Sequence, residues 1–210
     1  MRSKVTGAPA QEPVTLAEAK ASLRITTTDE DALVTQYLED ARIYAERITG
    51  RKFITQTVTS YHNGFDEKKD DYEPGFRRGL ISQAEAGQTL ELDFSPVQSV
   101  TSLSQVQSDN SEVVVSASQY YLDNFDDDMR SYVRSQDGIT DGTRSTNSIK
   151  VVYVAGYGDN PSDVPSALRR AIIAMVGYLY TNRGDCDMDS CAGQCGADKM
   201  LKGYILESLR

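Results

Sequence analysis

Residues 29–50 read DEDALVTQYLEDARIYAERITG, and this stretch decides the fold of the chain. Its apolar side chains recur at steps of three and four, which places them on one side of an α-helix. These positions are Leu33, Val34, Tyr37, Leu38, Ala41, Tyr44, Ala45 and Ile48. Acidic residues 29–31 suit a helix N-terminus, and Gly50 suits a left-handed C-terminal cap. The pattern predicts a helix from residue 28 or 29 to residue 49, about 30 Å long.

A shorter helix is expected before the long one. Thr15 and Glu18 have the spacing of a capping box, in which each side chain binds the free backbone N–H of the other residue. The helix that they begin should end near Leu23, and the threonines at 26–28 should separate it from the long helix. Residues 1–13 carry no such pattern and are predicted to form a flexible arm.

A third helix is expected to begin at Pro165, because proline is tolerated in the first helical turn. Its apolar positions are Leu168, Ala171, Ile172, Met175, Val176 and Leu179, widened by Ile173, Tyr178 and Tyr180. A helix that is apolar on most sides is covered on several sides. A single small core cannot cover all of this surface, so we expect a neighbouring subunit to cover part of it.

The stretch between these helices is predicted to be rich in β-strands, because it is Thr-rich, β-branched and interrupted by turn residues. The expected strands span 53–61, 89–94, 97–106, 112–115, 120–123, 131–134 and 149–155, with a charged loop over 62–79. Residues 184–198 are expected to be mobile, and 197–209 to form a short helix or a docking tail. The prediction is an α+β fold: a bundle of N-terminal and C-terminal helices with a β-rich insertion between them.

Four segments follow from this prediction. Residues 1–52 hold the arm and the first bundle helices, and residues 53–155 form the β-rich insertion. Residues 156–183 hold the C-terminal bundle helix, and residues 184–210 form a flexible tail that could dock on a partner. The sequence contains no internal repeat.

Composition excludes several classes of function. The chain has 210 residues, a net charge of −9 and a pI of about 4.7, and an acidic surface repels nucleic-acid phosphates. No apolar run approaches the length of about 20 residues that spans a membrane. The N-terminus has no apolar stretch after its charges, and three clustered cysteines do not form a disulfide framework. We therefore expect a protein made in a reducing cytoplasm.

No motif indicates catalysis, a cofactor or a metal. Cys186, Cys191 and Cys195 lack the paired spacing and the fourth ligand of a zinc site, and His62 lies far from them in the sequence. The glycines of residues 156–158 do not open a helix, so they fit a tight strand-to-helix connection better than a phosphate loop. The aspartates of residues 126–128 lack the spacing of a calcium loop. We expect no enzyme and no cofactor.

Tyrosine and arginine side chains on the helices are the candidate interface residues. The helical tyrosines fit a core whose hydroxyl groups lie at its edge, and they fit a subunit interface equally well, where Tyr and Arg are enriched. The candidates for an interface with another subunit or with a partner protein are Tyr37, Tyr44, Arg47, Ile173, Tyr178, Tyr180, Tyr204, Leu206 and Leu209.

Three segments in order resemble a known family. Residues 15–33 contain TLAEAK, LR and DAL, residues 41–57 contain ARIYAERITGR and ITQT, and residues 151–183 contain VVYVAGYG, VP and LYTNR. These segments are similar to the tailed-bacteriophage head–tail connector proteins. The resemblance covers about residues 14–60 and 149–183. The middle of the chain and its Cys-rich C-terminus do not share the pattern.

The resemblance implies an adaptor in the virion. Such a protein forms a homo-oligomeric ring, expected to be twelve-fold, beneath the portal protein, and joins the capsid to a neck, stopper or tail protein. The partner on which residues 184–210 dock, and which the candidate interface residues contact, would then be the portal. The ring continues the channel through which the genome DNA passes without sequence-specific binding. The residues are consistent with this implication: the chain is acidic, it has spare apolar helix surface, and it carries no catalytic constellation.

Two other classes remain open at this point. A DNA-binding packaging protein would use the first two helices as a helix-turn-helix and would need a basic recognition face. The long helix instead carries more acidic residues than its Arg42 and Arg47 can balance. A small hydrolase or carbohydrate-binding β-domain would need a pocket with convergent carboxylates or aromatic rings, and the chain contains no tryptophan.

Overall fold

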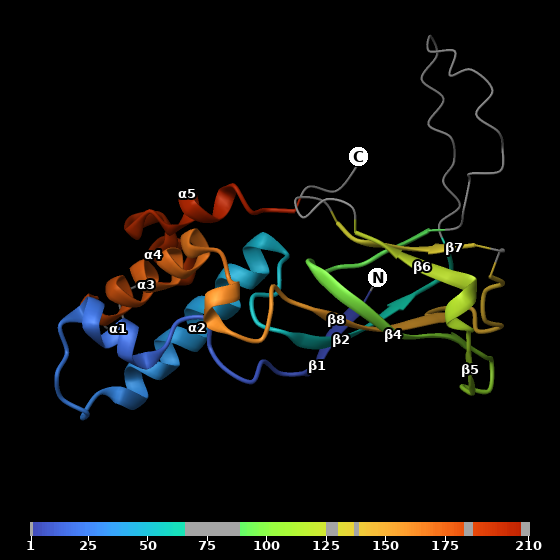
Figure 1. The fold of residues 1–210 in the computed structure, drawn as a ribbon, viewed down its shortest axis with the longest axis horizontal. Coiled ribbons are helices and arrows are strands. Elements are labelled where there is room, and N and C mark those ends of the chain that lie inside the picture. Colours follow the sequence, from blue (N-terminus) through green and yellow to red (C-terminus); the bar gives the residue numbers. More distant parts are fainter. Residues whose placement is uncertain (1, 66–88, 125–129, 137–138, 183–186, 207–210) are drawn as a thin grey trace, which may run out of the picture.

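The computed structural model describes residues 2–65, 89–124, 130–136, 139–182 and 187–206. Helices gather at one end of an elongated molecule and strands at the other, as Figure 1 shows. The predicted α+β class is confirmed. Each end has its own hydrophobic core.

Five helices form the helical end: α1 (Leu16–Leu23), α2 (Asp31–Thr49), α3 (Ser166–Thr181), α4 (Met188–Cys195) and α5 (Ala197–Lys202). Helix α3 contacts all the others, so the helices nearest the two termini share one core. The largest apolar side chains of this core that are fully buried are Phe53, Ile54, Leu168, Ile172, Met175 and Leu201.

The helix ends follow the local sequence. Thr15 and Glu18 form the predicted capping box at the start of α1. The long helix α2 begins at Asp31, two or three residues later than predicted, and ends at Gly50 with a left-handed φ of 70°. Helix α3 follows Pro165 directly. The glycine cap lets the chain reverse into the strands without the steric cost of a Cβ atom.

Five strands form the larger sheet: β1 (Arg2–Gly7), β2 (Gln56–His62), β4 (Val97–Val106), β5 (Glu112–Val114) and β8 (Ile149–Ala155). Their order across the sheet is β1-β2-β8-β4-β5, and every neighbouring pair is antiparallel. Strand β8 alternates strictly between buried and half-buried residues, as expected for a strand with one face on a core.

A second, smaller sheet packs against one face of the first sheet, and the two sheets share a hydrophobic core. The smaller sheet contains β3 (Thr89–Glu91), β6 (Tyr120–Asp123) and β7 (Tyr132–Ser135) in the order β3-β7-β6, again antiparallel. The shared core takes Leu90 and Val133 from the small sheet. Two short 3₁₀ turns, η1 (Ala117–Gln119) and η2 (Pro161–Asp163), complete the described elements.

Two predictions about the chain ends need correction. The arm expected over residues 1–13 contains strand β1, which pairs with β2. Little in the sequence indicates this strand, because β1 is short and its pairing partner lies about 50 residues away. Its residues alternate between exposed and half-buried. The tail expected from residue 184 contains α4 and α5, which bury Cys191, Ala192, Ala197 and Leu201 against the helical core. Small residues carry most of this packing, so the sequence shows little apolar periodicity. Most of the loop predicted over 62–79 lies outside the described residues.

Gly156 marks the tight connection that was expected after the last strand. Its φ is +141°, and an added Cβ atom would lie 2.7 Å from the backbone of Ile54. We expect Gly156→Ala to lower the free energy of unfolding by more than about 1 kcal/mol, because strain and overlap act together. Chemical denaturation measures this change.

Gly193 is the matched control for that substitution. It lies inside α4, and an added Cβ atom would meet nothing within 4 Å. Gly193→Ala should therefore raise stability by about 0.5–1 kcal/mol, because alanine favours a helix over glycine. Equal effects of the two substitutions would contradict the tight turn at Gly156.

Candidate assembly site

The junction between α2 and β2 is buried and charged. Glu46 is only 2% exposed. One of its carboxylate oxygens accepts hydrogen bonds from the Phe53 N–H (3.1 Å) and the Gln56 amide (2.8 Å), and the other accepts from the Lys52 ammonium (2.9 Å). The Arg42 guanidinium lies 3.5 Å from the same carboxylate. Buried charges are stable when they are paired and hydrogen-bonded in this way.

Two further contacts extend this junction. Arg42 also donates to the Glu12 carboxylate at 2.7 Å, which ties the segment before α1 to α2. The Lys52 ammonium lies 4.4 Å from the centre of the Phe94 ring, in cation–π geometry. The junction therefore connects the helical end, the N-terminal segment and the loop before β4.

Arg51 connects the junction to the C-terminal part of the chain. It is 1% exposed, and it donates to the backbone carbonyl of Tyr204 at 2.6 Å and to the hydroxyl of Tyr157 at 3.2 Å. The Leu206 N–H donates to the carbonyl of Thr49 at 3.0 Å. These contacts hold the segment after α5 against the turn between α2 and β2. The described C-terminal residues are thus part of the folded body.

Two predicted interface residues are buried in the single chain. Tyr44 is 8% exposed and Leu206 is 6% exposed. Burial raises the pKa of Tyr44 to about 12, and a hydrogen bond to Asp189 contributes to the shift. The Arg47 guanidinium lies over the Tyr44 ring at 5.4 Å and 3.6 Å from the Asp189 carboxylate. This cluster joins α2 to the start of α4.

The other candidates lie at the rim of the helical core. Tyr37, Ile173, Tyr178, Tyr180 and Tyr204 are half-buried and pack against that core. The Tyr180 hydroxyl donates to the Glu30 carboxylate, which ties the end of α3 to the start of α2. Arg47 is exposed, and Leu209 lies outside the described residues. The role of these residues between subunits stays a prediction.

Other apolar residues are more exposed than the tyrosine, isoleucine and leucine candidates that the structure describes. They are Ile43 (50%), Ile48 (36%) and Ile205 (42%) at the helical end, and Val113 (49%), Val114 (69%) and Tyr121 (46%) at the strand end. Ile48 was assigned to the buried stripe of α2, and the structure corrects this. Sequence reasoning missed the rest, although Ile43 lies off the apolar stripe and two adjacent valines in a short strand cannot share one buried face.

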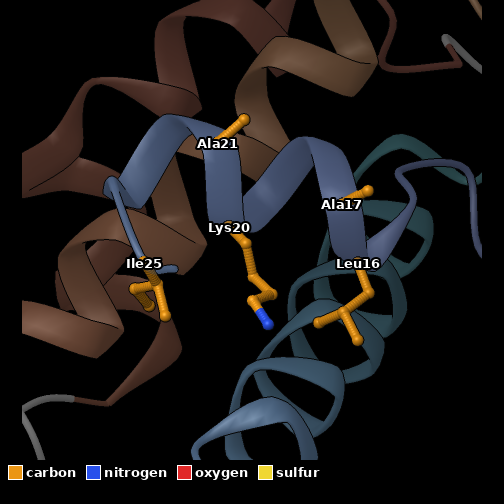
Figure 2. A pocket seen from close by; sticks show the side chains of 5 residues that line it. All are labelled: Leu16, Ala17, Lys20, Ala21 and Ile25. Carbon is orange, nitrogen blue, oxygen red and sulfur yellow. The ribbon is translucent and has the colours of Figure 1, made fainter. Parts of the chain in front are cut away.

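A shallow depression of about 540 Å³ lies along α1 and is lined by Leu16, Ala17, Lys20, Ala21 and Ile25. Figure 2 shows Leu16, Lys20 and Ile25 extending from one side of the helix, with Ala17 and Ala21 on the other side. Lys20, the one ionisable residue of this lining, pairs with Asp31. Such a lining fits an apolar side chain of a partner, and it holds no pair of groups for acid–base chemistry.

The residues considered for metal chemistry are dispersed. Cys191 is buried beside the Met175 carbonyl, Cys195 is half-buried, and Cys186 lies outside the described residues. His62 ends β2 and bonds Ser60 at 3.0 Å. The described part of the chain holds no group of three or more His, Cys, Asp or Glu residues that could bind a metal ion. No described helix is both long and apolar enough to cross a membrane. The aspartates of residues 126–128 lie outside the described residues.

A model of the family described as phage gp6-like head-tail connector protein matches residues 13–119, which is half of the chain. The chain belongs to this family. No curated protein matches the chain.

Solved neck structures have the same fold over the whole chain. The neck of an empty gene transfer agent particle, computed with C6 symmetry, contains a chain with a TM-score of 0.76 and 21% identity; the likeness covers 100% of this chain and 98% of that one. A chain in the virion of the native particle gives a TM-score of 0.74 and 20% identity at the same coverages. A chain in the native neck computed with C12 symmetry gives 0.68 and 18%, again at the same coverages. At these identities the likeness shows a shared fold.

Proposed function

We propose that this protein is a structural component of the neck of a phage-like particle. Copies form a closed ring beneath the portal, join the capsid to the next neck or tail protein, and continue the DNA channel. The observation that carries the proposal is the family match over residues 13–119, together with a fold shared along the full chain with proteins of particle necks. Its location is then the head–tail interface of the virion.

Twelve copies are the proposed ring size. The similar chains belong to necks computed with C6 and C12 symmetry, and a twelve-fold ring is compatible with both symmetries because it contains the six-fold rotation. Adjacent copies contact head to tail, because a heterologous interface closes into a ring when its rotation fits. The exposed Ile43 and Ile48 on α2 and the depression along α1 offer apolar surface for such contacts.

The helical end and the strand end take different partners in this proposal. The helices of the N-terminal and C-terminal parts form the ring body, and the β-rich middle faces the next neck or tail component. The portal-docking role expected for residues 184–210 is assigned to α4, α5 and the segment after them. Ile205, 42% exposed after α5, offers an apolar contact there. In contrast to a tail that folds on binding, α4 and α5 present a preformed surface.

The acidic chain suits a channel through which DNA slides. A net charge of −9 keeps phosphates from binding to the wall. The DNA-binding alternative requires a basic face on α2, but Arg42 is buried between carboxylates and Arg47 is the one exposed cation of that helix. We expect no tight, salt-sensitive binding of duplex DNA in a gel-shift at low salt.

Inactivating the gene tests the proposal. We expect lysates with DNA-filled heads and separate tails, and tailed particles should return when the gene is supplied in trans. Electron microscopy counts both forms. Normal numbers of tailed, infectious particles without the protein would contradict the proposed function.

A further inference from the structure

In the part of the chain that the structure describes, no strand pairs with the outer edge of β1 or of β5, and the two edges lie level with each other. Within the described residues, β1 and β5 are the outermost strands of the five-stranded sheet. The register places Arg2, Tyr61, Lys150, Ser104 and Val114 in one row across the sheet. An open edge presents backbone N–H and C=O groups that can pair with another strand.

The directions of the strands specify how two copies could join. All four neighbouring pairs are antiparallel, so β1, β8 and β5 run in the same direction. A rotation about an axis roughly along the strands keeps that direction. It would bring β1 of one copy beside β5 of the next as a parallel pair, at the same level of the sheet.

The side chains of β5 are unusually exposed for a strand with two valines. Val113 and Val114 are 49% and 69% exposed, although successive side chains point to opposite faces. Both faces of β5 are therefore exposed to water. An added strand would shield part of both valines from water.

The two edges differ in charge. Strand β1 reads RSKVTG and contains no acidic residue, and the Lys4 side chain is exposed. Strand β5 begins with Glu112, whose carboxylate pairs with Lys150 of the same sheet at 2.8 Å, and the turn before β5 exposes Asp109. Lysine on an edge strand opposes pairing with a like strand and favours pairing with an acidic one. This difference favours β1 against β5 over two copies of the same edge.

We propose that β1 of one copy pairs in parallel with β5 of its neighbour, so that the five-stranded sheets join into a continuous belt around the ring. This inference rests on the ring proposed above and adds a lateral contact at the strand end to the helical contacts proposed there. The occupant of each edge is therefore a second copy of this chain. A strand from a different neck protein is the competing occupant of β5.

Paired cysteines test this contact in assembled particles. In a chain with C186S, C191A and C195S, Val114→Cys is combined in turn with Arg2→Cys or Lys4→Cys. The rows of the sheet place Val114 level with Arg2, and a slip of two residues between copies keeps the same faces of the sheet together. Adjacent strands place paired Cα atoms about 5 Å apart, within disulfide range. We expect at least one pair to give a ladder of covalent oligomers on a non-reducing gel.

Controls separate the possible results. Val114→Cys with Ala32→Cys, on an exposed position of α2, should give no ladder. A ring seen by microscopy without a ladder from any pair would overturn the strand pairing and leave the proposed function intact. Dimers from Val114→Cys alone would show β5 against β5, and a disulfide to another protein would show the competing occupant. Either result would overturn the inference.

Discussion

Replacing Leu201 with alanine is expected to lower the free energy of unfolding by about 3 kcal/mol. The side chain is fully buried in α5 and packs in the core shared by all five helices. Removing its methyl groups loses their transfer free energy and leaves a cavity between α5 and α3. Urea denaturation followed by circular dichroism measures the change.

Ile205 is the matched control for Leu201. It lies four residues later and is 42% exposed, so Ile205→Ala should cost less than about 1 kcal/mol. If Leu201→Ala were as mild as Ile205→Ala, residues 188–206 would behave as the mobile tail that the sequence suggests. Since these residues belong to the core, a deletion of 184–210 should yield an unstable chain, not a folded monomer that merely loses portal binding.

Glu46→Gln is expected to destabilise the protein by about 3–5 kcal/mol. The substitution keeps the shape of the side chain but removes the negative charge, so Lys52 and Arg42 stay buried without their shared carboxylate. Breaking one member of a buried ion pair leaves an uncompensated charge in a medium of low polarity. Thermal and urea unfolding both report the loss.

Glu39→Gln is the matched control on the same helix. Glu39 also approaches Arg42, at 4.0 Å, but its side chain is 59% exposed, so the substitution should change stability by less than about 1 kcal/mol. The double variant Glu46→Leu, Lys52→Met should be milder than Glu46→Gln, because it removes both charges together. A Glu46→Gln chain as stable as Glu39→Gln would contradict a buried network at the junction.

The junction between α2 and β2 explains why the burial of charged side chains in residues 41–51 could not be predicted, although the segment itself resembles a known family. Arg42, Glu46 and Arg51 lie in the ARIYAERITGR segment, where helical charges are usually solvated. Their burial depends in part on Glu12 and Tyr204, which lie elsewhere in the chain. Local patterning cannot predict such distant pairings.

Elements with a strong local signal were predicted closely. Strands β4, β6 and β8 have the predicted bounds, and α2 and α3 keep their predicted C-terminal and N-terminal signals. Strand β1 was missed because its pairing partner β2 lies about 50 residues away, and helix α4 was missed because small residues carry its packing. Six of the candidate interface residues lie on α2 and α3, Tyr204 and Leu206 follow α5, and the most exposed apolar side chains lie at other positions.

A cryo-electron microscopy reconstruction of the particle vertex tests the central claim most directly. The account predicts twelve copies of this chain in a closed ring between the portal and the tail, with DNA passing through its centre. Particles in which the chain is absent from the vertex, or present as separate copies that do not touch one another, would contradict it.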